Sequence, residues 1–318
     1  MDQLTVSQLV RDARFAGFLL VRSSEQRTDS KGKFYLDMNL ADRTGEINCK
    51  MWNPTVAPPP SGAVAWVQGT VQEFNGRLQL RIDAIRPRTP QDDVDLAKLV
   101  PCAPEKPSVM LQTINDTIAR FESEDLKKLV REMLRLAGED LVWFPAAQRM
   151  HHAERSGLLH HTTDMLRTAE YIIQSYPFLH GDLLRAGVIL HDLAKIQEMK
   201  SDKLGNVSDY SRDGLLVGHL VRGVATLELA AQNVGVGGEL LELLEHMIIS
   251  HHGIPEYGSP RLPMFPEAEA LHWIDTLDTR MNEMQGIQER TPEGAFSEKI
   301  YSLDGRRMYH PFYTDTAE

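Results

Sequence analysis

The chain has 318 residues, 42% of them apolar and 25% charged, with a formal net charge of −11. This composition is that of a globular protein with room for two domains, and no segment reaches the roughly 18–20 apolar residues of a membrane span. The N-terminal segment lacks the layout of a secretory signal, and Cys49 and Cys102 form no CxxC pair. These features argue against a disulfide framework and a zinc–thiolate site, and they predict a cytoplasmic location.

The charge is distributed unevenly along the chain. Residues 1–90 contain 12 Lys/Arg and 9 Asp/Glu, whereas the remainder contains 22 and 36. An acidic protein as a whole is a poor partner for phosphate backbones, but a local basic excess can still attract one. Surface charge that serves only solubility explains the same pattern, so charge alone leaves nucleic-acid binding open.

Residues 1–88 predict a small β-barrel. Apolar and alternating runs predict five strands, at residues 15–22, 33–40, 46–52, 63–74 and 77–85. The alternation in the second strand is expected to place four side chains on one face: Phe34, Leu36, Met38 and Leu40. Asn75-Gly76 is a strong hairpin signal between the last two strands. Five short strands, with a Pro-rich break at residues 53–62, favour an all-β OB-fold barrel.

The pattern changes after the barrel. Residues 89–107 contain four prolines and are expected to form a semi-rigid linker. Residues 108–290 show helical periodicity and predict an all-α domain, with helices at 108–122, 124–137, 158–175, 181–196, 213–232, 237–251 and 267–286. No strand signal stands out there, and the tail at residues 291–318 is expected to be polar and loop-like.

Histidines are concentrated in the helical region. Eleven of the 12 lie between residues 151 and 272, and imidazole is a common ligand of divalent transition metals. The adjacent pair His191-Asp192 follows a strongly apolar run, so its carboxylate is expected to be buried and to need a cation. An ion pair between Asp192 and Lys195 would also satisfy this carboxylate, and it is compatible with metal binding.

Other candidate ligands recur on separate predicted helices. They are His160 or His161, His219, His251 or His252, and Asp275 or Asp278. Each histidine taken alone is more often a hydrogen-bonded core residue. Several helices that each supply one or two inward nitrogen or oxygen ligands are typical of a metal site inside a helical bundle.

The ordered series H…HD…H…HH…D resembles the HD phosphohydrolase superfamily. Together with the barrel, five segments make the chain similar to the YhaM family of 3′→5′ exoribonucleases over residues 14–312: HHAERSGLLHHT, HDLAKI, GHLVRG, ISHHGIPEYGSP and EAEALHWIDTLD. The resemblance implies an OB-fold joined to an HD domain that hydrolyses single-stranded RNA, with single-stranded DNA as a further substrate left open. Homo-oligomerisation also stays open.

The resemblance further implies a site for two divalent ions. Four residues match the ligands of one ion: His161, His191, Asp192 and Asp275. His219 and one or both of His251 and His252 match the ligands of a second ion, which Asp192 would bridge. In one departure from the family, His160 stands where Glu or Tyr is usual. Mixed His/Asp ligands favour Mn²⁺, with Fe²⁺ or Co²⁺ as alternatives to Mg²⁺.

Several further residues are candidates for contact with the substrate. Lys195 could contact a phosphate, and His151, His152 and Arg155 could touch the substrate backbone or protonate the leaving oxygen, with His152 as the catalytic candidate. On the barrel, stacking or backbone contacts are expected from some of Phe34, Tyr35, Trp52, Phe74 and Arg77, with Tyr35 the best candidate.

Two other readings compete with an exonuclease. One is an HD phosphohydrolase that acts on a small nucleotide or cyclic dinucleotide, for which an OB-fold has little use. The other is an RNA-binding protein with a decayed site, which the complete set of candidate ligands disfavours.

Overall fold

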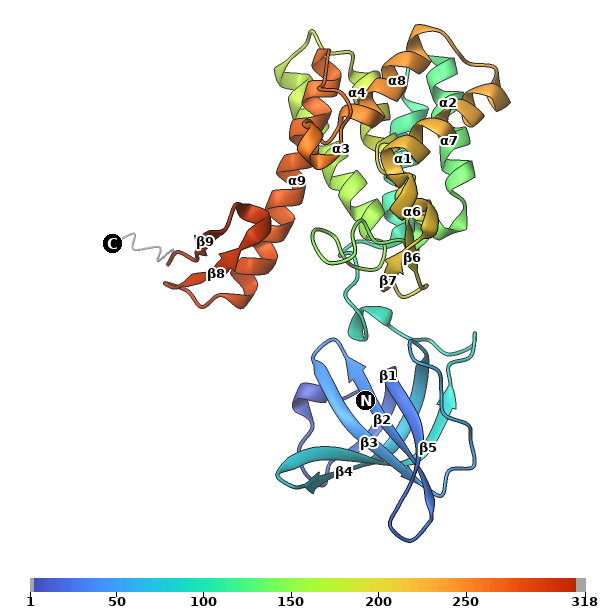
Figure 1. Cartoon of the computed structure of the whole chain (residues 1–318), viewed down its shortest axis with the longest axis vertical. Helices are drawn as coiled ribbons and strands as arrows, with labels where there is room; N and C mark the ends of the chain where they lie inside the picture. Colours follow the sequence, from blue (N-terminus) through green and yellow to red (C-terminus); the bar gives the residue numbers. More distant parts are fainter. Residues whose placement is uncertain (1–2, 313–318) are drawn as a thin grey trace. The chain divides into compact units, whose positions relative to one another are not determined.

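The computed structural model describes residues 3–312 and divides into two compact units, Met1–Cys102 and Ala103–Glu318 (Figure 1). The boundary falls within the Pro-rich segment at residues 89–107. The fold class predicted from the sequence, an OB-fold barrel followed by a helical HD domain, is confirmed.

The first unit is a closed five-stranded barrel with the strand order β1-β2-β3-β5-β4. Its strands are β1 (Arg14–Thr28), β2 (Phe34–Asp42), β3 (Gly45–Trp52), β4 (Val64–Phe74) and β5 (Arg77–Pro87). All neighbouring strands are antiparallel except β3 and β5, which pair in parallel and close the barrel. Asn75 and Gly76 both have positive φ, as the tight β4–β5 hairpin requires.

Alternation along β2 fills the barrel core as predicted, with one exception. Leu36, Met38 and Leu40 are buried, but Phe34 is 57% exposed. Phe34 is the first residue of β2 and lies outside the apolar core, so it is exposed although alternation gives it the same face.

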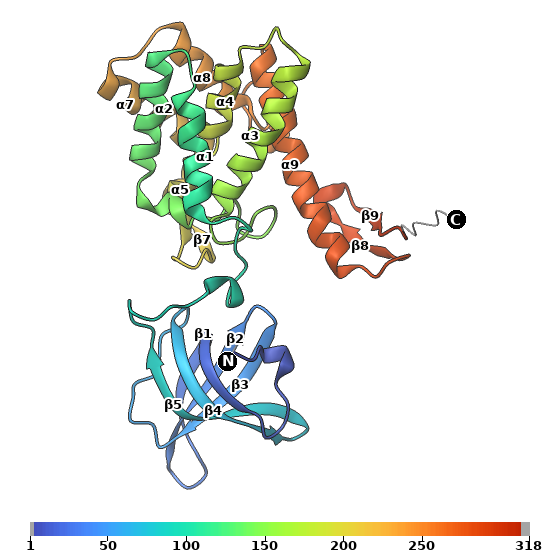
Figure 2. The same cartoon turned by 180° about the vertical axis from the view of Figure 1, so that it is seen from behind.

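The second unit contains nine α-helices among its described residues, 103–312. They are α1 (Pro107–Ala119), α2 (Glu124–Ala137), α3 (Gly157–Ser175), α4 (Gly181–Leu190), α5 (Lys195–Glu198), α6 (Arg212–Leu216), α7 (Gly218–Val234), α8 (Glu239–Ser250) and α9 (Pro266–Arg290). Figure 2 shows this bundle from behind. None of the helices in the described part of the chain is both long and apolar enough to cross a bilayer.

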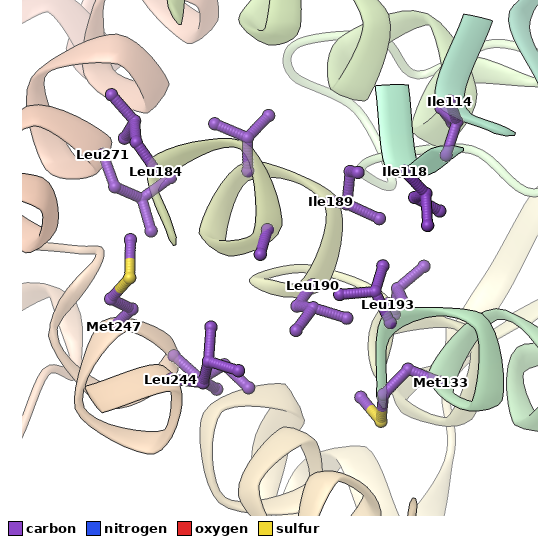
Figure 3. Close-up of a cluster of buried hydrophobic side chains, with 14 of the residues drawn as sticks. Ile114, Ile118, Met133, Leu184, Ile189, Leu190, Leu193, Leu244, Met247 and Leu271 are labelled. Atoms are coloured by element: carbon purple, nitrogen blue, oxygen red, sulfur yellow. The ribbon is translucent and has the colours of Figure 1, made fainter. Parts of the chain in front are cut away.

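Helix α4 lies at the centre of this bundle and contacts α1, α2, α3, α8 and α9. Figure 3 shows how its side chains Leu184, Ile189 and Leu190 pack against residues from the surrounding helices, including Met247 and Leu271. The apolar character of the α4 sequence therefore reflects burial on all sides, and the chain leaves this core directly into the segment that carries His191 and Asp192.

Two predicted helices are interrupted. The helix expected over residues 181–196 ends at Leu190, and residues 191–194 form tight turns before α5 begins. The helix expected over residues 213–232 is divided at Val217, and Gly218, the first residue of α7, has a φ of 77°. Apolar periodicity continues through both breaks, so the sequence pattern did not reveal them.

Two short hairpins in this unit were not predicted. Strands β6 (Met199–Ser201) and β7 (Val207–Tyr210) pair after α5, and β8 (Phe296–Ile300) pairs with β9 (Arg306–Tyr309) beyond α9 (Figure 1). The prediction of a loop-like tail after residue 291 is therefore wrong. Strands of three to five residues are too short to give a period-two signal.

The core around α4 generates a stability prediction. Leu184 is fully buried, so Leu184→Ala should lower the free energy of unfolding by about 2–5 kcal/mol, because it leaves a cavity that the rigid bundle cannot fill. Urea unfolding followed by far-ultraviolet circular dichroism measures this loss. Leu215 is 70% exposed, and the control Leu215→Ala should change the same free energy by about 0.5 kcal/mol or less. Equal losses in both variants would contradict this account of the core.

Candidate metal centre

Five parts of the helical unit direct polar side chains to one buried place. The contributors are His161 from α3, His191 and Asp192 from the turn after α4, His219 from the first turn of α7, His251 and His252 from the end of α8, and Asp275 from α9. His161, His191 and Asp192 are at most 3% exposed. Residues 114 positions apart in the sequence thus meet in the interior, as in metal sites built within helical bundles.

Asp192 lies between two groups of histidines. Its Oδ2 atom is 3.4 Å from Nε2 of His191 and 3.7 Å from Nε2 of His161. Its Oδ1 atom is 3.5 Å from Nε2 of His219 and 3.6 Å from Nε2 of His251. Each carboxylate oxygen therefore faces a different pair of ring nitrogens.

The ligand atoms are close enough to share ions. Nε2 of His161 lies 3.3 Å from Nε2 of His191 and 3.3 Å from Oδ1 of Asp275. Three sets of candidate ligand atoms lie within 4.8 Å of one another around Asp192: His161 with His191 and Asp192, His191 with His251 and Asp275, and His219 with His251 and His252. His161, His191, Asp192 and Asp275 therefore lie close enough to hold one ion together.

Three buried atoms in this centre have no hydrogen-bond partner: Oδ1 of Asp192, Nε2 of His219 and Nε2 of His251. A buried polar atom without a partner costs about 1–3 kcal/mol, and more when it is charged. All three lie on the same side of Asp192, so a single cation there would satisfy them together. The residues present fit a metal ion.

The histidines are oriented by a second set of contacts. In each of the five rings, Nδ1 is held by an oxygen atom and Nε2 is left facing the centre. The holding groups are Asp278 for His161, the Val188 carbonyl for His191, Glu198 for His219, the Ile248 carbonyl for His251 and the Tyr257 carbonyl for His252, at 2.6–3.0 Å. Such anchoring fixes the tautomer and ring orientation of metal-binding histidines.

These contacts also distinguish the members of two of the three pairs that the sequence left open. His161 faces the centre, whereas His160 turns its two ring nitrogens to Glu154 and Asp164. Asp275 faces Nε2 of His161, whereas Asp278 holds Nδ1 of the same ring. The geometry therefore places Asp275 toward the centre and Asp278 behind it.

The electrostatics favour a positive charge at this place. Burial alone would lower the pKa of His161, but the carboxylates of Asp275 and Asp278 raise it to about 10. Burial alone would raise the pKa of Asp192, but the charges of Lys195 and His191 hold it well below its usual value. The site therefore keeps its carboxylates ionised and attracts a cation even at low dielectric.

The other predicted catalytic residues lie around this centre. The buried Nζ of Lys195 is 2.6 Å from Oδ2 of Asp192, so the ion pair expected from the sequence forms. Nε2 of His152 is 2.8 Å from Asp278, which also holds His161. The ring of His151 lies 5.5 Å from that of His161, and burial lowers the pKa of His151 to about 3. Nε of Arg155 donates to the Lys203 carbonyl.

The barrel carries a separate group of aromatic side chains. The rings of Tyr35 and Trp52 lie 4.8 Å apart, and Nζ of Lys50 lies 5.1 Å from the Tyr35 ring centre and 5.8 Å from that of Phe74. Trp52 is 46% exposed and Phe74 is 60% exposed. These exposed rings around one ammonium group form a surface suited to stacked bases and a phosphate backbone.

A hollow of about 900 Å³ adjoins this surface. Phe74 and Arg77 line it together with polar side chains of β3 and β5, among them Asn48 and Gln79. The Gln79 amide donates to the Asn48 side chain across the parallel pair β3–β5. Polar groups therefore line this hollow beside the exposed rings.

Two residues that the sequence analysis did not select hold or accompany the site. Glu198 anchors His219 from 21 positions away, and Lys50 lies between the aromatic rings of the barrel. The contact of Glu198 depends on the packing of α5 against α7, for which the sequence offers no spacing signal. Lys50 belongs to the predicted third strand, where alternation gives its face but not its neighbours.

A buried cluster of histidines and aspartates inside a helical domain, joined to an OB-fold, defines an HD-type phosphohydrolase coupled to a nucleic-acid-binding module. Comparison with known proteins agrees: residues 17–88 match the family model of the OB-fold nucleic acid binding domain, and residues 158–280 match that of the HD domain.

Curated relatives give the particular family. The chain is 36% identical over 303 residues to the 3′-5′ exoribonuclease YhaM of Geobacillus sp. (strain WCH70), covering 93% of this chain and 92% of the relative. It is 37% identical over 303 residues to that of Bacillus subtilis (strain 168), covering 93% and 94%. The chain belongs to the YhaM family, so the predicted family and enzyme class are confirmed.

The anchoring contacts predict which outer residues control metal affinity. Glu198→Ala removes the carboxylate that holds His219, so it should weaken divalent-metal binding about 10- to 100-fold by freeing the ring and lowering its basicity. Isothermal titration with Mn²⁺ measures this change. Glu242 is exposed on α8, and the control Glu242→Ala should bind Mn²⁺ as the wild type does. Unchanged affinity in Glu198→Ala would remove Glu198 from the site.

Proposed function

We propose that this protein is a divalent-metal-dependent 3′-5′ exoribonuclease that hydrolyses single-stranded RNA, with single-stranded DNA as a second substrate to be tested. The observation that carries the proposal is the buried Asp192, whose two oxygens face two different pairs of histidine nitrogens. The curated relatives named as 3′-5′ exoribonucleases support the polarity and the substrate class. A cytoplasmic location is part of the proposal, because a chain with two cysteines suits a reducing compartment.

Two ions are assigned to the centre. The first would be held by His161, His191, Asp192 and Asp275, and the second by Asp192, His219, His251 and His252. Mn²⁺ is the proposed metal, with Fe²⁺ or Co²⁺ as alternatives, because imidazole-rich ligand sets suit these ions better than Mg²⁺. Bound ions would lower the pKa of a water molecule and stabilise the negative charge on a phosphodiester during its hydrolysis.

Lys195 is proposed to neutralise part of the negative charge of Asp192 and to contact the substrate phosphate. Burial disfavours its ammonium form, yet the nearby Asp192 carboxylate raises its pKa above the usual value. Lys195 therefore stays charged at the edge of the ligand set, where it can hold a non-bridging phosphate oxygen while remaining 2.6 Å from Asp192.

The histidines that precede α3 receive different assignments. Because the pKa of His151 is lowered to about 3, its ring is neutral at physiological pH and suits hydrogen bonding to a phosphate rather than proton donation. His152 is buried and contacts Asp278 through Nε2, so we reassign it from proton transfer to holding Asp278. Arg155 stays a candidate for contact with the RNA backbone.

The barrel is assigned to single-stranded RNA. Tyr35, Trp52 and Phe74 would stack on bases, and Lys50 and Arg77 would contact phosphates. Aromatic rings can stack on any of the four bases. This suits an enzyme that degrades RNA from one end, because such an enzyme meets every base in turn. The competing hypothesis, a phosphohydrolase that acts on a small nucleotide, does not account for this exposed aromatic surface.

Metal removal tests the proposal directly. End-labelled RNA and DNA should be stable with the enzyme in EDTA, and Mn²⁺ should restore stepwise shortening from the 3′ end, read on a sequencing gel over time. Asp192→Asn should lower kcat by about 10³-fold or more, because it weakens both assigned ions through their shared ligand. Activity that persists in EDTA would contradict the proposal.

The barrel assignment predicts a loss of binding without a loss of chemistry. Phe74→Ala should weaken affinity for single-stranded RNA by about 1–3 kcal/mol, the value of one base–aromatic stack. Fluorescence anisotropy in the Asp192→Asn background measures this without cleavage, and the control Tyr171→Ala changes a 72% exposed ring on α3.

Deleting residues 1–88, the barrel, distinguishes an exonuclease from a hydrolase of small nucleotides. An exonuclease should lose activity on long RNA, whereas a small-nucleotide hydrolase should keep its activity on a mononucleotide substrate.

A further inference from the structure

We propose a third divalent-metal site in the helical unit, formed by His152 Nδ1, His160 Nδ1 and Glu154 Oε1. It lies behind the centre assigned above and shares no ligand with it. The proposal concerns a structural ion that fastens the turn at residues 151–156 to α3, and it stands apart from the proposed exoribonuclease activity.

The three ligand atoms converge. Nδ1 of His160 is 2.7 Å from Oε1 of Glu154 and 3.1 Å from Nδ1 of His152, and the remaining separation, between His152 and Glu154, is 3.9 Å. These separations allow one ion to lie about 2 Å from all three atoms, which is the usual bond length of zinc to imidazole and carboxylate. Ligand sets of two His and one Glu are used by zinc proteins.

Both histidines have the outer contacts of metal ligands. Nε2 of His152 is 2.8 Å from Oδ2 of Asp278, and Nε2 of His160 is 3.1 Å from Oδ2 of Asp164. Each ring therefore turns one nitrogen to a carboxylate and the other to the shared point, as in the carboxylate–histidine–metal arrangement. The anchoring repeats that of His161 and His219, where one ring nitrogen also meets a carboxylate.

The two Nδ1 atoms face each other, an arrangement that a cation between them would stabilise, and Nδ2 of Asn282 lies 3.4 Å from Nδ1 of His152. Nδ1 of His152 and Nδ1 of His160 are 3.1 Å apart, a contact of the same kind as the 3.3 Å between Nε2 of His161 and Nε2 of His191 in the centre already described. Three carboxylates, those of Glu154, Asp164 and Asp278, surround the two rings. This excess of negative charge in a largely buried place suits a divalent ion.

The backbone holds the ligands in place. His152 adopts a positive φ of 46°, its N–H donates to the Asn282 side chain on α9, and its carbonyl accepts from Ala146. His160 lies on α3, so an ion here would join the turn to that helix. Asp278 contacts both His152 and His161, which links this site to the first assigned ion.

Counting bound ions tests the proposal. The full-length protein is dialysed to equilibrium against Co²⁺, and bound cobalt per chain is measured by mass spectrometry together with the visible absorption of the bound ion. We expect three ions for the wild type and two for the double variant Glu154→Gln/His160→Gln. The control Glu105→Gln changes a surface carboxylate paired with Arg167 and should keep three ions.

The outcomes distinguish this proposal from the function proposed above. The Asp192→Asn variant is expected to lose the two ions assigned to the centre around Asp192. If it still binds one ion per chain, the third site is supported, whatever the activity of this variant on RNA. If the double variant binds as many ions as the wild type, His160 is a hydrogen-bonded imidazolium between Glu154 and Asp164, and the proposal is overturned. Circular dichroism checks that the double variant is folded. If it is not folded, bound ions are counted in the single variant Glu154→Gln instead, and the same two outcomes apply.

Discussion

A carboxylate buried in a helical core is the constraint on which the active half of this molecule depends. Asp192 is 3% exposed and directly follows α4, the most enclosed helix of the bundle. An ionised carboxylate there is costly unless cations surround it. Lys195 supplies one charge, and the histidines from α3, α7 and α8 supply ring nitrogens that suit metal ions. The surrounding fold can be understood as the framework that brings these groups to one buried oxygen pair.

The fold meets this constraint by interrupting its own helices. Helix α4 ends at Leu190, and His191 at its C-cap bonds the carbonyl of Val188 through Nδ1 and turns Nε2 inward. The break before α7 places His219 within reach of Glu198. Local departures from regular structure at a functional site are expected where side chains must converge from several elements, and the apolar core around α4 supplies the stability that compensates for them.

The two units carry different chemical groups. The helical unit gathers histidine nitrogens and carboxylate oxygens in a buried interior, whereas the barrel leaves aromatic rings and basic groups on its surface. This division explains how a chain with a net charge of −11 can serve a polyanionic substrate. The basic excess lies in the barrel, and the acidic excess of the remainder includes the carboxylates of Asp278 and Glu198, which hold the rings of His161 and His219 in place.

By itself, the sequence determined the classes of structure and the residues eligible for the site. Alternation predicted the five strands of the barrel, 3.6-residue periodicity predicted the major helices, and the clustering of histidines indicated metal chemistry. Both patterns are local, so they survive in a single sequence. The short hairpins β6–β7 and β8–β9, the ends of α4 and the exposure of Phe34 carry no such periodic signal.

Only the tertiary structure decided which of the eligible residues face one another. His160 and His161, or Asp275 and Asp278, are neighbours in sequence and chemically alike, and their roles differ because helix rotation and packing turn them to different partners. The contact between Glu198 and His219 likewise exists only once α5 and α7 pack together. Side-chain direction at a site is set by contacts between distant elements, and no local pattern in the chain records it.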